Sequence, residues 1–257
     1  MSRPLALLSN DDGYNRAGIR ALRDALLPLF DVVIVAPETE QSASSHALSL
    51  HRPLRSREVE PGIFAIDGTP ADCVYIALHA TGRYLKRRPD VVVSGLNHGL
   101  NLGQDVFYSG TVAAAREGAL RGIPALATSA DSGADRTACA EAVAKIAFTL
   151  ATESARVPSM RAPLLNLNFP RNWSGALRVT TLGTRMYAEL VDARVDPRGR
   201  EYLWLGGPGI SHHGASGSDT EAYDQGVASL TPLLLDLTSS SPDLLQFLHA
   251  AVSNHTP

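Results

Sequence analysis

The sequence is poor in cysteine, has no excess of basic residues and contains no long hydrophobic run, and each absence excludes a class of protein. Its two cysteines, Cys73 and Cys139, are isolated and lack the spacing of a metal-binding pair, which indicates a reducing compartment. The 257 residues include 23 basic and 26 acidic ones, so the basic surface of a nucleic-acid-binding protein is not expected. No apolar run is long enough to span a membrane, and the N-terminus has no secretion signal. We therefore expect a cytoplasmic protein whose partners include neither a membrane nor a nucleic-acid polymer.

What the chain does have is a short apolar run followed at once by a polar cluster near its start. Residues 5–8 are typical of a buried parallel strand, and Asp11 and Asp12 come soon after it. Open α/β sheets bind ligands at the carboxyl ends of their strands, so these carboxylates are candidates for a site. They act together only if the backbone turns there, which Asn10 and Gly13 permit. Paired carboxylates suit Mg²⁺ or Mn²⁺; the alternative is a polar turn that caps the next helix.

The apolar patterns predict alternating strands and helices over the first 170 residues. Buried strands are expected at residues 5–8, 32–36, 90–94, 124–129 and 164–168, and helices at residues 17–30, 70–80, 112–121 and 137–152. The first strand, helix and strand form a βαβ unit, whose crossover is expected to be right-handed. The predicted fold class is therefore α/β, with a doubly wound, mostly parallel, Rossmann-like sheet formed by residues 1–170.

A second informative stretch follows the third predicted strand. Residues 95–105 contain three glycines and two asparagines, and Ser109 and Thr111 then stand at the expected start of a helix. Such a loop allows the backbone to approach phosphate oxygens closely, and a helix start favours an anion. The stretch has neither the Gly-Lys-Ser/Thr of a Walker loop nor the GxGxxG of a dinucleotide site. Residues 68–72 open another helix, where a structural cap and an anion site are both open interpretations.

The composition changes after residue 170. Residues 183–205 are charged and aromatic around an Asp-Pro-Arg-Gly turn, which predicts a long hairpin that projects as an interaction surface. Residues 206–219 are expected to form a loop, in which His212 and His213 are interpreted as solvated rather than metal-binding. A strand and an amphipathic helix are expected at residues 227–237 and 242–252. Residues 171–257 are thus predicted to be a hairpin and helix segment that partly completes the core.

Several of these stretches together resemble one family. The segments that carry the resemblance are Ser9–Gly13, Val35–Pro37 with Ser42, Gly68–Cys73, Val93–Gly103, Tyr108–Val112, Arg185–Tyr187, Asp196–Arg200 and Ser218–Thr220. They are similar to the stationary-phase survival protein SurE family over nearly the whole chain. The resemblance implies a phosphatase that depends on one divalent metal ion per subunit and hydrolyses nucleoside 5′- and 3′-monophosphates, with some members also trimming short polyphosphate. It also implies that residues 1–170 are the catalytic core and that C-terminal segments are exchanged in a homodimer or homotetramer.

The resemblance further implies roles for individual residues. The catalytic carboxylates would be Asp11 and Asp12, which would also bind the metal together with Ser42 and Asn97. The residues that would bind phosphate and substrate are Asn10, Gly95, Asn101, Ser109, Gly110 and Thr111. One departure from the family lies in the loop after Ser42, which reads Ala43-Ser44-Ser45-His46 where many members have a glycine.

Several questions about mechanism are open at this level. Four ligands from three loops leave positions for water and a phosphate oxygen, which favours hydrolysis by a metal-activated water; a route through an aspartyl phosphate is the rival. His98 and His46 are candidates for the general acid, and Tyr108 or Tyr14 for stacking on the base. A nucleotide-binding sensor without turnover and a structural oligomer are the alternatives to an enzyme.

Overall fold

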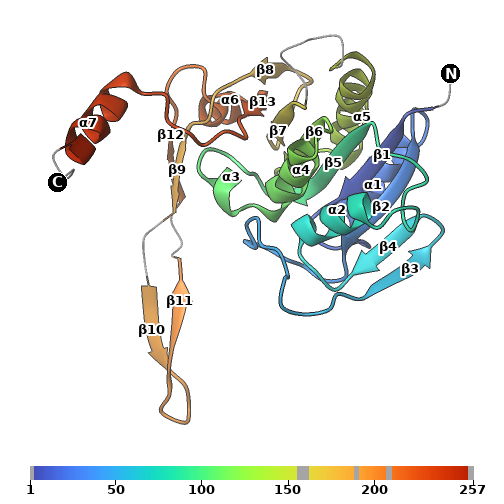
Figure 1. Cartoon of the computed structure of the whole chain (residues 1–257), viewed down its shortest axis with the longest axis horizontal. Coiled ribbons are helices and arrows are strands. Elements are labelled where there is room, and N and C mark those ends of the chain that lie inside the picture. The colour runs from blue at the N-terminus through green and yellow to red at the C-terminus, as the bar shows by residue number, and fades with distance from the viewer. Residues whose placement is uncertain (1–2, 155–161, 188–190, 207–209, 254–257) are drawn as a thin grey trace.

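The computed structural model describes residues 3–154, 162–187, 191–206 and 210–253, and its centre is a nine-stranded sheet (Figure 1). The elements of the first part of the chain are β1 (Leu5–Ser9), α1 (Ala17–Leu26), β2 (Asp31–Pro37), β3 (Ser56–Glu60), β4 (Ile63–Ile66), α2 (Pro70–His79), β5 (Val91–His98), α3 (Asp105–Tyr108), α4 (Gly110–Leu120), β6 (Ala125–Ala130), α5 (Arg136–Glu153) and β7 (Leu164–Phe169). Those of the second part are β8 (Leu177–Val179), β9 (Thr184–Tyr187), β10 (Val191–Val195), β11 (Glu201–Leu205), β12 (Ile210–His213), α6 (Asp219–Asp224), β13 (Ala228–Leu233) and α7 (Pro242–Ser253). The predicted α/β class and its five buried strands are confirmed.

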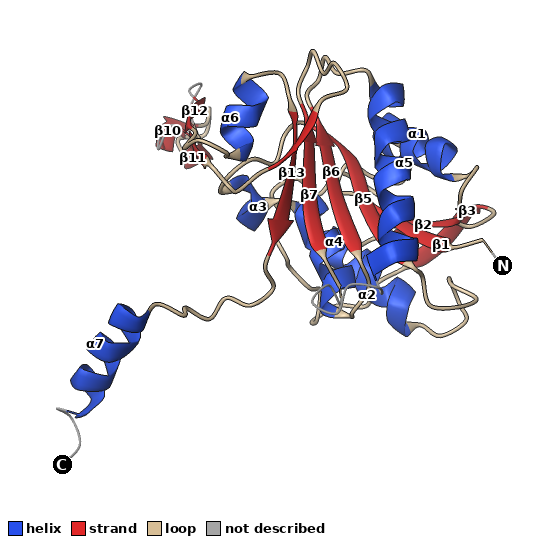
Figure 2. Ribbon diagram, turned by 90° about the horizontal axis from the view of Figure 1, so that it is seen from above, coloured by secondary structure: helices blue, strands red, loops and turns tan. Residues whose placement is uncertain are grey.

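Helices cover both faces of the sheet, which explains the continuous apolar runs of its strands. Helices α1 and α5 pack on one face, and α2 and α4 pack on the other (Figure 2). Along β1, Ala6 and Leu8 belong to the core under α1, whereas Leu5 and Leu7 belong to the core under α2. Every residue of such a strand is buried, so no polar alternation remains in its sequence. Each leucine buried in this way contributes about 1.5–3 kcal/mol relative to an exposed one.

The order of the strands places the ends of β1 and β5 at a point where the winding of the chain reverses. The order is β3-β4-β2-β1-β5-β6-β7-β13-β8, and β1 pairs in parallel with both β2 and β5. The chain moves outward from β1 in one direction through β2, and in the other through β5, β6 and β7. Open α/β sheets bind ligands outside the carboxyl ends of the strands at such a reversal. The turn that holds Asp11 and Asp12 and the end of β5, which holds Asn97, are therefore neighbours.

The sheet continues past residue 170. Strand β13 lies antiparallel to β7, with Ser229 opposite Asn168, and β8 joins β13 in parallel. The strand predicted at residues 227–237 is confirmed as β13. The C-terminal part of the chain thus supplies two strands to the body as well as projecting elements.

The described residues from β9 to β12 project from the body as an arm (Figure 1). Strands β9 and β12 pair antiparallel at its base, and β10 and β11 form the hairpin at its end. The predicted hairpin is confirmed for β10 and β11, but the loop predicted at residues 206–219 is wrong, because β12 contains His212 and His213. Backbone groups make the pairing of β12, so a Gly/Ser/His composition without an apolar run did not indicate a strand. The side chains of the two histidines lie outside the described part of the structure.

Helix α7 stands apart from the body in both ribbon views (Figures 1 and 2). It confirms the amphipathic helix predicted at residues 242–252, and Leu244, Phe247 and Leu248 are exposed on it. Among the described residues, no helix has the length and apolar character needed to cross a membrane.

Candidate active site

A pocket of about 700 Å³ opens at the carboxyl ends of β1 and β5. The four side chains predicted to bind a metal, Asp11, Asp12, Ser42 and Asn97, all line it. They come from the turn after β1, the loop after β2 and the end of β5. The parallel pairing of β1 with its two neighbours puts these three strand ends side by side. Residues far apart in the sequence thereby share one cavity.

The turn after β1 aims two adjacent carboxylates into this pocket. Asn10 Nδ2 donates to Gly13 O over 2.9 Å, and Gly13 N donates to Asn10 Oδ1 over 3.2 Å. Gly13 has a φ of +114°, which glycine adopts without the strain of a side chain. The alternative in which this turn caps the next helix is wrong, because Arg16 stands at the N-cap of α1 and makes no side-chain cap.

Asp11 is buried and held by Thr111, at the start of α4. Thr111 N donates to Asp11 Oδ2 over 3.0 Å, and Thr111 Oγ1 donates to Oδ1. The pKa of Asp11 is raised to about 6: burial is the main cause, the hydrogen bonds from Thr111 oppose it, and the charge of Asp12 adds to it. A buried carboxylate with a raised pKa is stabilised in its charged form by a nearby cation. The position therefore favours a bound cation.

Asp12 lies beside Asp11 and is partly exposed. Burial also raises the pKa of Asp12, and the hydrogen bond that His98 N donates to Oδ2 over 3.3 Å opposes this shift. Arg16 Nε donates to the backbone oxygen of Asp12 over 3.3 Å, and its guanidinium lies 3.9 Å from Glu40 Oε2. Both carboxylates of the pair are thus oriented by groups from other elements.

The oxygen atoms of the four side chains fit a hard divalent cation. Ser42 Oγ donates to Glu40 Oε1 over 2.8 Å, which leaves its lone pairs for an ion. Asn97 Nδ2 donates to Gly99 O over 2.9 Å, which leaves Oδ1 as the atom it can offer. Carboxylate, hydroxyl and amide oxygens are the ligands that Mg²⁺ and Mn²⁺ prefer. Within the described part of the chain, no three His, Cys, Asp or Glu side chains gather as a zinc-type site requires.

The loop that carries Ser42, residues 38–51, is fastened to α3 and α4. Ser45 donates to two backbone carbonyls at the end of α3, from N over 3.0 Å and from Oγ over 2.7 Å. Further along, His46 Nε2 lies 3.0 Å from the Oε2 of Glu117, a carboxylate that is only 2% exposed in the middle of α4. The position of Ser42 in the pocket therefore depends on two contacts made by later residues of the same loop.

The helix start at residues 68–72 fastens the same loop from the other side. Thr69 and Asp72 form a reciprocal capping box at the start of α2. Thr69 Oγ1 also donates to Ala47 O over 2.7 Å, and Asp72 Oδ1 accepts from Ser49 N over 2.9 Å. None of residues 68–72 lines the pocket. Of the two interpretations of this stretch, the structural cap is confirmed, and the structure adds the anchoring of a loop to it.

Ala43, next to Ser42, adopts a φ of +54°. This left-handed conformation costs a residue with a side chain roughly 1–2 kcal/mol, and glycine is the residue that adopts it freely. The segment in which many family members have a glycine thus contains a backbone position that favours glycine.

The six residues predicted to bind phosphate and substrate divide into two groups. Asn101 and Ser109 line the pocket. The residues that do not line it are Asn10, Gly95, Gly110 and Thr111. Two of these allow close packing around the site, because a Cβ at Gly95 would lie 2.3 Å from Thr128 O and one at Gly110 would lie 2.8 Å from Ser44 Oγ.

Asn101 is anchored to β6 and β7. Its Nδ2 donates to Ser129 Oγ over 2.7 Å, and its N donates to Asn168 Oδ1 over 2.8 Å. The side-chain amides of Asn166 and Asn168 donate to its carbonyl oxygen over 2.7 and 3.1 Å. These four hydrogen bonds fix the loop after β5 to the sheet. A direct contact between Asn101 and phosphate stays a prediction.

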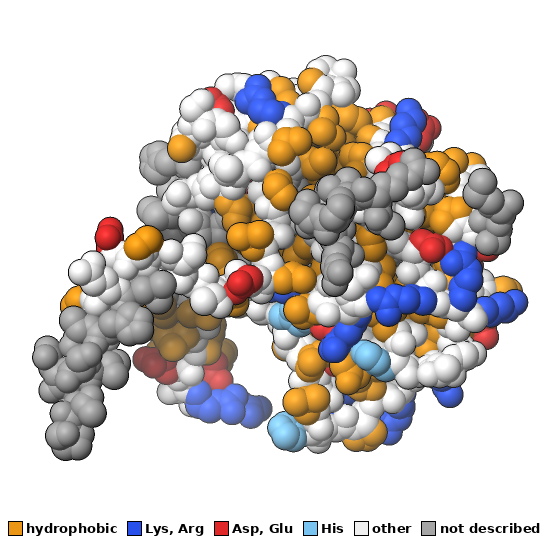
Figure 3. Space-filling view, turned by 45° about the horizontal axis from the view of Figure 1, so that its top comes forward, with side chains coloured by type: hydrophobic (Ala, Val, Ile, Leu, Met, Phe, Trp, Pro, Cys, Tyr) orange, Lys and Arg blue, Asp and Glu red, His pale blue; other side chains and the backbone are white. Residues whose placement is uncertain are grey.

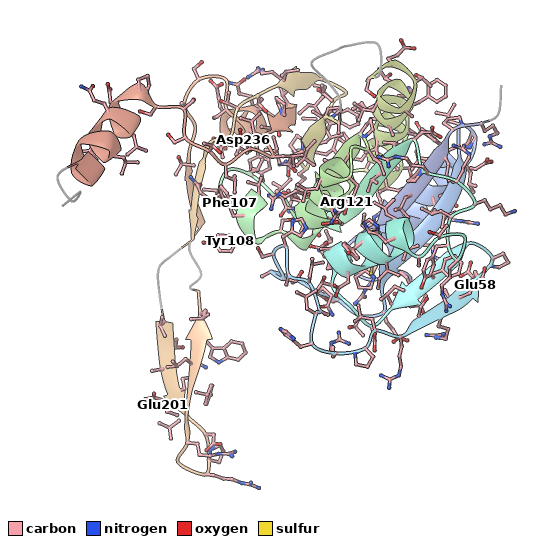
Figure 4. The ribbon with its side chains drawn as sticks, viewed as in Figure 1. Glu58, Phe107, Tyr108, Arg121, Glu201 and Asp236 are labelled. Atoms are coloured by element: carbon pink, nitrogen blue, oxygen red, sulfur yellow. The ribbon has the colours of Figure 1, made fainter. Side chains whose placement is uncertain are left out.

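The structure separates the candidates for proton transfer and for stacking. His98 lines the pocket, whereas His46 does not and contacts Glu117 instead. Tyr108 lines the pocket and is 65% exposed, whereas Tyr14 does not line it. Figure 4 shows Phe107 and Tyr108 on α3, close to the base of the arm.

Five charged residues that line the pocket were missed from the sequence: Arg16, Glu40, Asp105, Asp131 and Arg136. Asp131 directly follows β6, and a polar residue at the end of a predicted strand was a signal that could have found it. Arg16 and Arg136 stand at the starts of α1 and α5. No local signal distinguishes them from the other surface arginines.

Comparisons with known proteins show the family to which the chain is similar. The sequence profile of the family described as Survival protein SurE matches residues 6–189. A 5′-nucleotidase SurE from Sorangium cellulosum is 57% identical over 255 residues, which cover 99% of each chain. A 5′-nucleotidase SurE from Anaeromyxobacter dehalogenans is 50% identical over 234 residues, which cover 90% of each chain. The crystal structure of the SurE protein from Aquifex aeolicus matches with a TM-score of 0.79 and 36% identity, over 96% of this chain and 100% of that one. The chain therefore belongs to the SurE family of survival proteins.

Proposed function

We propose that this protein is a divalent-metal-dependent phosphatase that hydrolyses nucleoside 5′- and 3′-monophosphates to nucleoside and phosphate. The observation that carries the proposal is the presence of Asp11, Asp12, Ser42 and Asn97 in one pocket at the strand reversal. The nucleotidase part is supported by the family and by relatives named 5′-nucleotidase SurE. Metal dependence and the use of 3′-nucleotides go beyond those names and rest on the site and the family resemblance.

One Mg²⁺ or Mn²⁺ per subunit would be held by these four side chains. When bound, such an ion supplies positive charge to the phosphate and acidifies a nearby water molecule. Thr111 holds both carboxylate oxygens of Asp11, and the amide of His98 holds Asp12. The ligands are therefore oriented before substrate arrives, which reduces the reorganisation needed during the reaction.

The start of α4 would hold the phosphate oxygens that face away from the ion. Among the first amides of this helix, that of Thr111 is engaged by Asp11, and that of Val112 donates to Ser109 Oγ over 3.1 Å. The amide of Gly110 and the positive end of the helix dipole are left for an anion. Ser109, which lines the pocket, adds a hydroxyl at the same place.

Attack by water is favoured over a route through an aspartyl phosphate. Both oxygens of Asp11 accept hydrogen bonds from Thr111, so Asp11 is held as a ligand rather than presented as a free nucleophile. His98 lines the pocket and is the histidine placed to give a proton to the leaving nucleoside oxygen. A structure with beryllofluoride bonded to Asp11 or Asp12 would contradict the water route.

Release of phosphate from AMP and 3′-AMP tests the proposed activity. We expect turnover with Mn²⁺ and none after chelation. Asp11→Asn is expected to lower kcat/KM at least about 100-fold, because one charged ligand is lost. Asp24→Asn is the matched control, since Asp24 is 71% exposed on α1 and should leave the rate unchanged. Nucleotide binding without turnover would indicate a sensor, and no metal-dependent turnover of any nucleotide would rule out the enzyme.

A homodimer or homotetramer formed by exchange of C-terminal segments is the assembly we propose. Trp204 and Leu205 on the arm are 61% and 83% exposed, and Phe247 on α7 is 68% exposed. The space-filling view shows hydrophobic side chains gathered on the projecting arm (Figure 3). Exposed apolar groups of this size mark surfaces that another protein covers. Leu205→Asp is expected to shift the protein to a smaller species in size-exclusion chromatography. An unchanged elution volume would count against the arm as an interface.

Two further predictions accompany the proposal. Trimming of short polyphosphate is the second activity to assay, because its end group is also a phosphate that fits the metal end of the pocket. Location in the cytoplasm is the expected place of action, and neither a membrane nor a nucleic-acid polymer is an expected partner.

A further inference from the structure

The loop that joins β5 to α3 contributes to the wall of the pocket, and the base of the arm lies against it (Figure 1). This segment, residues 99–105, is named here the β5–α3 loop, and its Asn101 and Asp105 line the pocket. The hydrogen bonds of Asn101 to β6 and β7 hold the loop on the side of the body. On the side of the arm, contacts come from residues 183–185 and 219, in the C-terminal part of the chain.

A fully buried carboxylate, that of Asp219 at the start of α6, bridges the β5–α3 loop and the base of the arm. Its Oδ2 accepts from Gly103 N over 2.9 Å, and its Oδ1 accepts from Gly183 N over 2.7 Å. Gly183 directly precedes β9, the first strand of the arm. Hydrogen bonds to a carboxylate are stronger than those between neutral groups. Both oxygens of Asp219 are thus used to hold two backbone segments together.

The two segments that Asp219 bridges are in direct backbone contact. A Cβ at Gly103 would lie 2.7 Å from Gly183 O and 3.0 Å from Arg185 N. A Cβ at Gly183 would lie 2.1 Å from Thr220 Oγ1, on α6. Closely packed groups of this kind transmit a displacement rather than absorb it. The β5–α3 loop, the base of the arm and the start of α6 are therefore expected to move together.

Arg185 in β9 makes the second connection between the arm and the β5–α3 loop. Its Nη1 donates to Asp105 Oδ2 over 2.6 Å and to Leu100 O over 3.2 Å. Its backbone N donates to Gln104 Oε1 over 2.8 Å. The side chains of Arg185 and Asp105 are 14% and 7% exposed, so salt screens their ion pair only weakly. One residue of the arm thereby holds both ends of the loop, on either side of Asn101.

Buried charge is a costly way to hold a loop, but it fixes one arrangement. Removing the charged groups of Asp219, Asp105 and Arg185 from water carries a desolvation penalty that apolar contacts would not carry. Hydrogen bonds that satisfy these groups favour a single position of the loop, because they have fixed directions. A single position is what the wall of a reactive pocket requires, since a displacement of about 1 Å can abolish much of a group's effect.

We infer that Asp219 and Arg185 are positioning residues: they hold the β5–α3 loop against the base of the arm, so that a displacement of the arm is passed to the pocket wall. Neither residue lines the pocket, so both act through Asn101 and Asp105 of the loop. The inference rests on the proposed function where it concerns catalysis, because the reaction is the one assigned to that pocket. The four proposed metal ligands lie outside the loop, so the loop should affect the binding of substrate more than that of the metal.

Steady-state kinetics with AMP and Mn²⁺ test the positioning role. Arg185→Ala is expected to raise KM about fivefold, and Asp219→Asn, which keeps the shape of the side chain but only one of its acceptors, about threefold. Neither variant should change the Mn²⁺ concentration for half-maximal activity more than about twofold, because the metal ligands lie outside the loop. Arg185→Lys keeps the charge beside Asp105 and should restore most of the affinity.

Arg87→Ala is the matched control for Arg185→Ala. Arg87 makes the same two kinds of contact, an ion pair of 2.6 Å with Asp90 and a hydrogen bond of 2.6 Å to Arg3 O, and it does not line the pocket. KM should stay within about 1.5-fold of its original value. An equal rise of KM in the two variants would overturn the positioning role, because a general loss of stability would then explain both.

Hydrogen–deuterium exchange in the metal-free protein tests the connection without any turnover. Arg185→Ala and Asp219→Asn are each expected to speed the exchange of amides in residues 99–105 at least about tenfold, and to leave β1 unchanged. The side chain of Arg185 has no acceptor, so faster exchange in Arg185→Ala would report movement of the loop rather than loss of a partner for an amide.

The two measurements together decide the inference. Unchanged exchange of residues 99–105 in both variants would refute the connection between the arm and the loop. Faster exchange with unchanged KM and kcat would refute the positioning role. If the unaltered protein hydrolyses no nucleotide, the proposed function fails, and the exchange of residues 99–105 still decides whether the base of the arm holds the loop.

Discussion

In most proteins charged residues are exposed and apolar residues are buried. The pocket departs from this rule by burying charged residues, and the arm departs from it by exposing apolar ones. In the pocket, charged and polar groups are buried: Asp11 is 7% exposed, and Thr111 behind it is fully buried. On the arm, apolar groups are exposed, with Leu205 at 83%. Folding by itself favours the reverse in both places. Under the proposed function, a cation would offset the buried charge in the pocket, and a second subunit would cover the exposed apolar groups on the arm.

The two regions also differ in how they are held. The contacts of the pocket join residues far apart in the sequence, such as Asp11 with Thr111 and His46 with Glu117. The hairpin of the arm is formed by neighbouring strands, with Val191 opposite Leu205. The geometry of the pocket thus requires the complete body, whereas the hairpin of the arm is shaped locally. Changes in the pocket should alter stability and activity together, and changes on the hairpin should alter assembly alone.

The largest change in stability is expected from Asp11→Asn in the metal-free protein. Because folding raises the pKa of Asp11 from 3.8 to about 6, the charged carboxylate destabilises the fold increasingly between about pH 4 and pH 6, and fully above that. The substitution should increase the free energy of unfolding near pH 8 by about 2 kcal/mol. It removes the penalty of about 3 kcal/mol for burying the charged carboxylate, and it loses a hydrogen-bond acceptor worth about 1 kcal/mol. Urea unfolding in a chelator measures it.

The gain from Asp11→Asn should disappear near pH 4, where the carboxyl is protonated in both states. Asp24→Asn, on the exposed face of α1, should show no such pH dependence. An equal gain for Asp11→Asn at both pH values would mean that burial of charge is not its cause.

The next effect is expected from Glu117→Ala, which breaks the contact that fastens the loop of Ser42. Glu117 lies 3.0 Å from His46 and 2.9 Å from Arg121, and it is 2% exposed. The substitution should lower the free energy of unfolding by about 1–2 kcal/mol. It should also raise the Mn²⁺ concentration for half-maximal activity several-fold, because the loop that carries Ser42 is released. Glu60→Ala is the control: it breaks an exposed pair with Arg20 and should cost less than about 1 kcal/mol without changing the Mn²⁺ requirement.

A smaller effect is expected from Ala43→Gly. The substitution relieves the left-handed backbone at φ +54°, and the extra freedom of glycine in the unfolded chain cancels part of the gain. We expect a net stabilisation of about 0.5 kcal/mol in urea unfolding. Ala47→Gly, in the same loop but without a positive φ, should destabilise instead. If both variants changed the free energy of unfolding in the same direction, backbone strain at residue 43 would not be the explanation.

The smallest effect on the body is expected from Leu205→Asp on the arm. Its side chain is exposed, so the free energy of unfolding of dissociated subunits should change by less than about 0.5 kcal/mol. Unfolding at low protein concentration, monitored in the body, measures this. A larger loss would show that the arm supports the body and would remove the contrast between the two regions.

The sequence predicted the parts of the fold that depend on local pattern. Residues 5–8 and 32–36 were recognised as buried strands because both faces of the sheet are covered, and the polar residues after them were placed at the strand ends. Strand β12 was missed because its pairing uses backbone groups that every residue has. The short helices α3 and α6 were missed as well, since neither is long enough to show a helical period.

The candidate site was predicted as a set of residues, and the structure gives those residues different surroundings. Thr111 and Asn101 were both predicted to contact phosphate, and those contacts stay predictions; in the structure Thr111 holds Asp11, and Asn101 is anchored by Asn166 and Asn168. The identity of a threonine or an asparagine does not reveal whether its side chain contacts a ligand or a neighbouring side chain. Only the positions of its neighbours separate the two roles.

By itself, the sequence determined the α/β class and the strands of the core, and it named candidates for binding a cation and a phosphate, because apolar runs and turn chemistry are local properties. The tertiary structure alone decided that Asp11, Asp12, Ser42 and Asn97 share one pocket and that Arg136 lines it as well. It also decided that Glu117 anchors the loop of Ser42. These facts depend on the order of strands in the sheet, which brings together residues separated by up to about half the chain.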